Sequence, residues 1–183
     1  KSWQSCSDHH ISPYDPAPLD SYRVTWPDVG AWEGGTRDTG TVHSGQASLC
    51  LRDDSPTTNL TVRTAERVPV VEGGYRLIYW VKTAEAGQPY LVTFNHYDDT
   101  GQWMWGKNND IHRTGSGRWE QVALIVDQFP AGAESAHVNF RPAPYRDDGA
   151  TTGTMWLDDV RLVEQASGEV AVEGRFEPLP PDA

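Results

Sequence analysis

The sequence predicts an all-β protein, a sandwich of two packed antiparallel sheets. Three observations support this prediction. No window keeps apolar residues at helical spacing for more than two turns. Short segments of alternating apolar and polar residues recur along the chain, separated by clusters of Gly, Pro, Asp and Asn. Each long segment has one apolar face and one mixed face, which is what two packed antiparallel sheets require.

The chain divides into an irregular N-terminal arm over 1–20, a β-sandwich over 21–165 and a C-terminal linker over 166–183. Three prolines in the arm exclude a central strand there. The Pro-rich end is typical of a linker, and we expect both ends to be cuts in a longer polypeptide. Strands are expected over 21–26, 47–51, 59–63, 67–71, 75–82, 90–97, 102–107, 119–126, 136–141 and 155–163.

Alternation assigns the side chains of these strands to the core or to the outside. Trp103 and Trp105 are two residues apart and therefore share a face. Trp119 is expected to be structural. The residues expected to face the core are Tyr75, Leu77, Tyr79 and Val81, then Tyr90, Val92 and Phe94, then Ala136, Val138 and Phe140, and finally Trp156, Asp158, Val160 and Leu162.

Charge and cysteine content exclude several classes of protein. The net charge of −11 and the absence of a run of Lys or Arg argue against nucleic acid or an anionic membrane as a partner. The longest apolar stretches, 77–81 and 122–126, are too short to span a bilayer. Cys6 and Cys50 are compatible with one disulfide, which favours a secreted, extracellular protein. We expect a monomer.

Five elements, in order, resemble a large group of jelly-roll carbohydrate-binding modules attached to xylanases, laminarinases and related enzymes. These elements are His43-Ser44-Gly45-Gln46-Ala47-Ser48-Leu49, Glu72-Gly73-Gly74-Tyr75 with Trp80-Val81-Lys82, Trp119 opening a strand, Phe129-Pro130-Ala131-Gly132-Ala133, and Gly153-Thr154-Met155-Trp156-Leu157-Asp158-Asp159-Val160. The resemblance covers roughly residues 24 to 163. It implies a non-catalytic jelly-roll domain that binds a polysaccharide or oligosaccharide and targets a covalently attached catalytic domain to it.

The sequence also provides a candidate carbohydrate site. Sugars have apolar C–H faces that stack on aromatic rings and hydroxyl groups that bind planar polar side chains. Residues of both kinds occupy the outward positions of the central strands, and we predict that they line one groove. They are Trp80, Lys82, Asn95, Tyr97, Trp103, Trp105, His137, Asn139 and Arg141. Positive side chains in this set favour an anionic sugar, whereas the net charge favours a neutral one.

A structural calcium ion is implied by the resemblance. In the resembling modules, the residue corresponding to Asp158 helps to hold calcium, together with backbone carbonyls near the turn at His43 to Gly45. This sequence lacks the N-terminal Phe-Glu element whose Glu completes that site. The alternative is that Asp158 caps backbone N–H groups.

Two other functions are consistent with the sequence. A small jelly-roll polysaccharide lyase would use Tyr97, His137, Asn139 and Arg141 for β-elimination. A structural spacer would bury Trp103 and Trp105 against this domain or a neighbouring one. No pair of carboxylates faces a cleft in the predicted site, which argues against a glycosidase.

Overall fold

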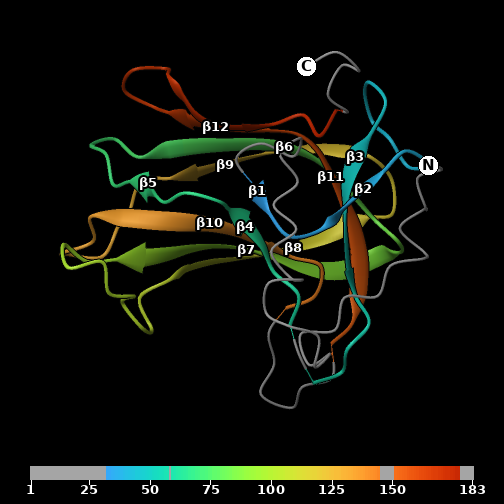
Figure 1. Cartoon of the computed structure of the whole chain (residues 1–183), viewed down its shortest axis with the longest axis horizontal. Helices are drawn as coiled ribbons and strands as arrows, with labels where there is room; N and C mark the ends of the chain where they lie inside the picture. Colours follow the sequence, from blue (N-terminus) through green and yellow to red (C-terminus); the bar gives the residue numbers. More distant parts are fainter. Residues whose placement is uncertain (1–31, 58, 145–150, 178–183) are drawn as a thin grey trace.

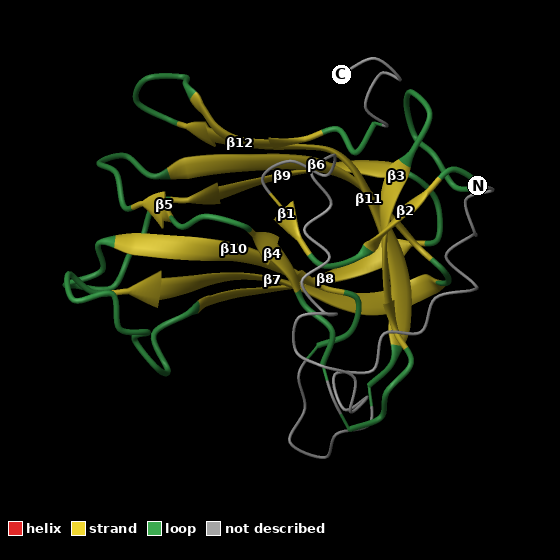
Figure 2. Ribbon diagram, viewed as in Figure 1, coloured by secondary structure: helices red, strands yellow, loops and turns green. Residues whose placement is uncertain are grey.

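The computed structural model describes residues 32–57, 59–144 and 151–177, and these form two six-stranded antiparallel sheets packed face to face (Figures 1 and 2). The predicted strand over 21–26 and the N-terminal arm lie outside the described residues. In the described ranges there is no helix, and so none that could cross a membrane. The prediction of an all-β sandwich with jelly-roll architecture is confirmed.

In each sheet, five strands pair in a continuous order, and a sixth strand pairs with one of the inner strands outside that order. Sheet A contains β1 (Trp32–Glu33), β4 (Val62–Thr64), β10 (Ser135–Arg141), β7 (Ala86–Tyr97) and β8 (Asn109–Ser116), with β5 (Val68–Pro69) on β10. Sheet B contains β2 (Thr36–Asp38), β3 (Ser48–Asp53), β11 (Gly153–Glu164), β6 (Tyr75–Thr83) and β9 (Glu120–Val126), with β12 (Val170–Gly174) on β11.

The core lies between the sheets and follows the predicted alternation on three strands. The inward residues of β6, β7 and β10 are all at most 1% exposed, and these are Tyr75, Leu77, Tyr79, Val81, Tyr90, Val92, Phe94, Ala136, Val138 and Phe140. Burying such side chains contributes about 1.5–3 kcal/mol each. The hydroxyl groups of Tyr79 and Tyr90 lie 3.2 Å apart and satisfy each other inside this core. The sequence pattern therefore predicted the packing of these strands correctly.

The prediction for β11 is wrong at two residues, because a bulge changes its alternation. Met155 and Leu157 face the core, the register with β6 shifts between Asp158 and Arg161, and Asp159 adopts φ +47°. After the bulge Val160 and Leu162 face the core, as predicted. Trp156 and Asp158 are the exceptions: they pair with Lys82 and Trp80 on the outer side of sheet B, where the turn at His43 and Ser44 covers Asp158. A bulge adds one residue to a strand and so inverts which residues face the core.

Trp156 consequently lies on the outer face of sheet B. Its Nε1 donates to Asp38 Oδ2 at 2.7 Å, and the Lys82 ammonium lies 5.6 Å from the centre of its ring. Asp38 is 3% exposed, so the indole N–H satisfies a buried carboxylate.

Two further predictions differ from the structure between β7 and β9. The segment 102–107 is a turn region in which only Trp103 forms a bridge, to Tyr97. On the side away from β10, β7 pairs with β8. The sequence analysis missed β8 because its residues are almost all polar. Its pairing along β7 shows that hydrogen bonding, rather than side-chain burial, defines this edge strand.

The sandwich continues beyond residue 165, the boundary drawn from the sequence. Strand β12 pairs with β11, and Phe176 is 2% exposed in the core. Arg37, which is buried, donates from Nε and Nη2 to the carbonyl oxygens of Phe176 and Glu177, both at 2.6 Å. Residues 166–177 therefore belong to the sandwich and not to a linker. The proline-rich sequence that suggested the linker begins only at Pro178, outside the described residues.

Cys50 is buried on β3 and is disulfide-bonded. Cys6, the other cysteine of the sequence, lies outside the described residues.

Candidate functional site

A polar row crosses the outer face of sheet A from one edge strand to the other. The strand registers place Glu33, Arg63, Asn139, Thr93 and Asp110 next to one another, on β1, β4, β10, β7 and β8 in that order. Paired residues of antiparallel strands share a face, so all five lie on the same side of the sheet. Arg63 and Glu33 form an ion pair at 2.9 Å at one end of the row. Thr93 and Asn139, in the middle of the row, are at most 2% exposed, so its accessible polar groups belong to Glu33, Arg63 and Asp110.

The neighbouring rows contain most of the site residues predicted from the sequence. Asn95 pairs with His137, and Arg141 lies two residues beyond Asn139 on β10. The outward orientation predicted for β7 and β10 brings these side chains together. We call this surface the sheet A face, and it comprises Arg63, Arg67, Thr93, Asn95, Tyr97, Trp103, Asp110, His137, Asn139 and Arg141.

An aromatic group lies at one end of the sheet A face. Trp103 pairs with Tyr97, which places both on the same side, and Trp103 is 46% exposed. The Arg67 guanidinium lies 4.3 Å from the centre of the Tyr97 ring, and the His137 ring meets it edge-on at 5.5 Å. Trp105 is 81% exposed in the turn that follows. Trp103 is therefore an accessible ring on the sheet A face itself, and Trp105 is a more exposed ring in the adjoining turn.

Two polar atoms on the sheet A face lack a partner. Thr93 Oγ1 and Asn95 Oδ1 are buried and make no hydrogen bond with any described residue. The Asn139 amide, by contrast, donates to the carbonyl oxygens of Thr93 and His137, at 3.2 and 3.0 Å. A buried polar atom without a partner costs about 1–3 kcal/mol, and because both atoms are shielded from solvent they provide no accessible acceptor on the sheet A face.

His137 is nearly buried and is held in place. Its Nδ1 lies 3.2 Å from Thr64 Oγ1, and its side chain is 8% exposed. Burial lowers the pKa of the His137 imidazole, and the Arg63 guanidinium lowers it further. The ring is consequently neutral near pH 7, able to accept or donate a hydrogen bond but not to provide a positive charge.

Trp80 is not part of the sheet A face, contrary to the prediction. It lies on β6, in sheet B, and pairs with Gln121 on β9, so it is on the opposite outer surface of the sandwich, as is Lys82. Alternation predicts which residues point outward but not which sheet they belong to. The prediction therefore placed residues from two opposite surfaces in one groove. The Trp80 ring stacks on His43 with 3.7 Å between centroids.

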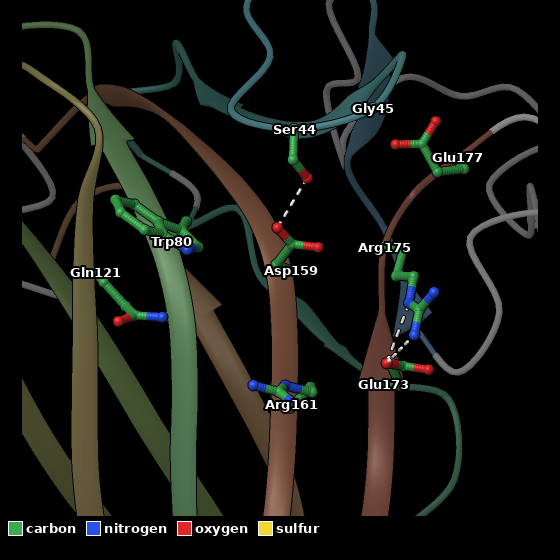
Figure 3. Close-up of a pocket in the computed structure, with 9 residues that line it drawn as sticks. All are labelled: Ser44, Gly45, Trp80, Gln121, Asp159, Arg161, Glu173, Arg175 and Glu177. Atoms are coloured by element: carbon green, nitrogen blue, oxygen red, sulfur yellow. Dashed lines mark hydrogen bonds and ion pairs between the residues drawn. The ribbon is translucent and has the colours of Figure 1, made fainter.

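A hollow surrounds Trp80 on the outer face of sheet B (Figure 3). It has a volume of about 450 Å³. Residues from β6, β9, β11, β12, the segment after β12 and the turn before β3 line it. They are Ser44, Gly45, Trp80, Gln121, Asp159, Arg161, Glu173, Arg175 and Glu177.

Asp158 is fully buried, and its carboxylate is satisfied by backbone amides. Oδ2 accepts from the N–H groups of His43 and Ser44, both at 3.1 Å, and Oδ1 accepts from the N–H of Asp159 at 2.9 Å. Burial raises the pKa of the Asp158 carboxyl, while these amides oppose that shift. The carboxylate holds the turn before β3 against the bulge of β11.

Comparison with known proteins identifies the fold. No family model and no curated protein matches the sequence. The C-terminal family 22 carbohydrate-binding module of Clostridium thermocellum Xyn10B is similar, with a TM-score of 0.55 and 16% identity over 76% of this chain and 89% of that one. A xylan-binding domain of family 22 gives 0.53 and 16%, over 73% of this chain and 86% of that one.

The chain has the jelly-roll fold of carbohydrate-binding modules. The enzymatically active domain of the bacteriophage CBA120 tailspike protein 4 has a similar part, with a TM-score of 0.52 and 16% identity. That match covers 73% of this chain but only 19% of the tailspike chain. The jelly-roll module thus corresponds to a small part of that structure.

Among the described residues, every hydrogen-bond partner of Asp158 is a backbone N–H donor. In the ranges 32–57, 59–144 and 151–177, no three His, Cys, Asp or Glu side chains gather as a metal site. Asp158 therefore caps backbone N–H groups, which is the alternative drawn from the sequence. Calcium binding by Asp158 with the backbone carbonyls of His43 and Gly45 stays a prediction.

The sequence analysis missed four residues of the sheet A face, of which Thr93 lies on the predicted strand over 90–97. Arg63, Arg67 and Asp110 join it only through strand pairing and packing, on strands that are very short or were not expected. No local pattern marks them, since the strand of Asp110 is almost entirely polar.

Proposed function

We propose that this chain is a non-catalytic carbohydrate-binding module that holds a polysaccharide on the sheet A face. The observation that carries the proposal is the strand register, which gathers an exposed indole and an unbroken row of polar side chains on one side of sheet A. Trp103 would stack on a sugar ring, and Asn95, His137 and Arg63 would bind hydroxyl groups. The fold shared with carbohydrate-binding modules supports this reading.

The module would act by proximity. A catalytic domain attached to the same polypeptide would be held near its polysaccharide, which raises the effective substrate concentration without new chemistry. Such a role implies a secreted protein. An open face leaves much of the sugar in water, so we expect modest affinity.

Neither alternative function gains support from the geometry. A lyase would need Tyr97 or His137 poised to take a proton, yet His137 is nearly buried beside Thr64, and the Arg67 guanidinium covers Tyr97. A spacer would bury Trp103 and Trp105 against this domain or a neighbouring one, and this domain leaves them 46% and 81% exposed.

Affinity electrophoresis tests the proposed function. The wild type, Trp103→Ala, Trp105→Ala and the control Ile125→Ala would run in gels containing soluble neutral or acidic polysaccharides. Ile125 is 62% exposed on sheet B, so it matches Trp103 in exposure but not in place. We expect one class of glycan to retard the wild type and the control but not Trp103→Ala.

Two other results would contradict the proposal. Absence of retardation in every gel would leave a spacer as the better reading. A rise in ultraviolet absorbance as an acidic polymer is consumed would reveal unsaturated ends and hence a lyase.

A further inference from the structure

The hollow around Trp80 has the chemical composition of a sugar site, although it lies on the opposite side of the sandwich from the sheet A face. Figure 3 shows Trp80 and Gln121 on one side of it, Asp159 and Arg161 in the middle, and β12 on the other side. Its volume of about 450 Å³ falls within the range of small-molecule sites. An indole ring, hydrogen-bond donors and hydrogen-bond acceptors therefore surround one small space.

Most of the charged groups here already have partners. Arg175 forms an ion pair with Glu173 at 3.1 Å, and Ser44 Oγ donates to Asp159 at 2.8 Å. The Glu177 carboxylate accepts from the Gln46 N–H at 2.8 Å. These contacts fix the rim of the hollow.

Two side chains next to Trp80 are different. Gln121, paired with Trp80 across β6 and β9, and Arg161, on β11, make no hydrogen bond or ion pair with any described residue. Both are exposed and line the hollow. An amide and a guanidinium beside an indole provide the donors, the acceptor and the apolar surface that a sugar ring requires.

The charges of the hollow select the kind of sugar. Three carboxylates, from Asp159, Glu173 and Glu177, stand against the guanidinium groups of Arg161 and Arg175, in a chain whose net charge is −11. The negative charge of a uronate or sulfate would be repelled by this excess of carboxylates. The hydroxyl groups of a neutral sugar, by contrast, donate hydrogen bonds to carboxylates. The ligand that fits is a neutral sugar.

We propose that the hollow around Trp80 is a second saccharide site, which takes one or two units of a neutral glycan independently of the sheet A face. Trp80 provides the stacking surface on the side not covered by His43. Gln121 and Arg161 donate to hydroxyl groups, and Asp159 and Glu173 accept from them. Two sites on opposite faces allow one module to engage two polysaccharide chains.

The test follows the indole N–H signals of Trp80 and Trp103 in ¹⁵N-correlated NMR spectra, assigned with Trp80→Phe and Trp103→Phe. Titrants are neutral hexasaccharides of xylose, glucose, mannose and galactose, and a hexasaccharide of galacturonic acid, each to about 20 mM, which detects even millimolar affinity. We expect a neutral sugar to shift the Trp80 signal in the wild type and in Trp103→Ala alike. The double variant Arg161→Ala with Gln121→Ala should lower the affinity measured from that shift at least tenfold. Arg76 is exposed elsewhere on β6, and Arg76→Ala should leave the affinity unchanged.

The outcomes separate the two proposals. If the Trp103 signal shifts while that of Trp80 stays in place with every neutral titrant, the second site is wrong and the sheet A face stands. If only the Trp80 signal shifts, the second site stands and the sheet A face does not bind. A Trp80 shift that survives the double substitution, or that only the galacturonic acid titrant produces, would also overturn the proposal.

Discussion

The Arg67 guanidinium lies over the Tyr97 ring, 4.3 Å from its centre, at the end of sheet A where Trp103 pairs with Tyr97. Such a contact stabilises an exposed pair by about 0.5–1 kcal/mol. It also occupies one face of the phenol ring. Trp103, rather than Tyr97, is therefore the ring that presents an accessible face to a ligand.

This arrangement predicts unequal effects of two substitutions on glycan binding. Trp103→Ala should weaken binding about tenfold, or about 1.4 kcal/mol, because it removes the stacking surface. Tyr97→Phe keeps the ring under Arg67 and should change the affinity by no more than about threefold. Titration calorimetry with the glycan that retards the wild type measures both. Equal losses would mean that the phenol hydroxyl contributes as much to binding as the indole, and would contradict the prediction.

Burial of His96 predicts a loss of stability in acid. The side chain is fully buried on β7, its Nε2 contacts Asn109 Oδ1, and its Nδ1 has no partner in the described part of the chain. Burial lowers the pKa of His96 below its ordinary value of 6.5. Below pH 6.5 the unfolded chain therefore binds a proton that the folded chain does not, so the free energy of unfolding falls as the pH falls.

Urea unfolding at several pH values between 7.5 and 5 checks this dependence. His96→Gln should flatten it. His137, whose pKa burial also lowers, contributes with the same sign, so some dependence should remain in that variant. His112→Gln, at an exposed position, is the control and should follow the wild type. A wild-type stability that rises on acidification through this range would contradict the prediction.

Gly45 is predicted to be costly to replace for two local reasons. It has φ +62°, and a Cβ there would displace the Glu177 carboxylate, which accepts a hydrogen bond from the Gln46 N–H. Gly132 has φ +84° but open space around it, so it carries the same backbone strain without the collision. Gly132→Ala should cost about 1–2 kcal/mol in unfolding free energy, and Gly45→Ala clearly more. Equal costs would show that the contact of Glu177 with the turn adds nothing.

The C-terminal boundary of the sandwich is testable through Phe176. Its ring is in the core, so Phe176→Ala should lower the free energy of unfolding by about 3–5 kcal/mol. Val170, at the start of β12, is 50% exposed, and Val170→Ala should cost less than about 1 kcal/mol. Urea denaturation compares the two. If Phe176→Ala hardly changes the free energy of unfolding, this segment does not stabilise the sandwich and the linker predicted from the sequence would be correct.

The amide cap on Asp158 makes a prediction about metal. Chelation with EDTA should leave the thermal unfolding midpoint unchanged, because backbone N–H groups already satisfy the carboxylate. Asp158→Ala should destabilise by about 3 kcal/mol, since three partly buried backbone N–H donors lose their acceptor. Asp54→Ala, at an exposed turn, is the control for chelation and charge. A midpoint that falls on chelation and recovers with added calcium would restore the calcium site implied by the resemblance.

The sequence by itself determined the two-layer β fold and the inner faces of its central strands. Leu77 and Tyr79 on β6, and Val92 and Phe94 on β7, could be assigned to the core because alternation has a period of two residues and an apolar side chain gains free energy only on the buried side. The outward positions of Asn95 and of the polar residues of β10 followed from the same rule.

Only the tertiary structure decided which outward residues meet. Trp80 and Asn95 both point outward, yet they lie on different sheets, because strand order depends on pairing between segments far apart in sequence. The bulge at Asp159 turned Trp156 out of the core, and pairing with β11 drew β12 into the sandwich. Period-two alternation fixes a side relative to the local backbone, whereas the partner, the register and the bulge are set by long-range hydrogen bonding and packing.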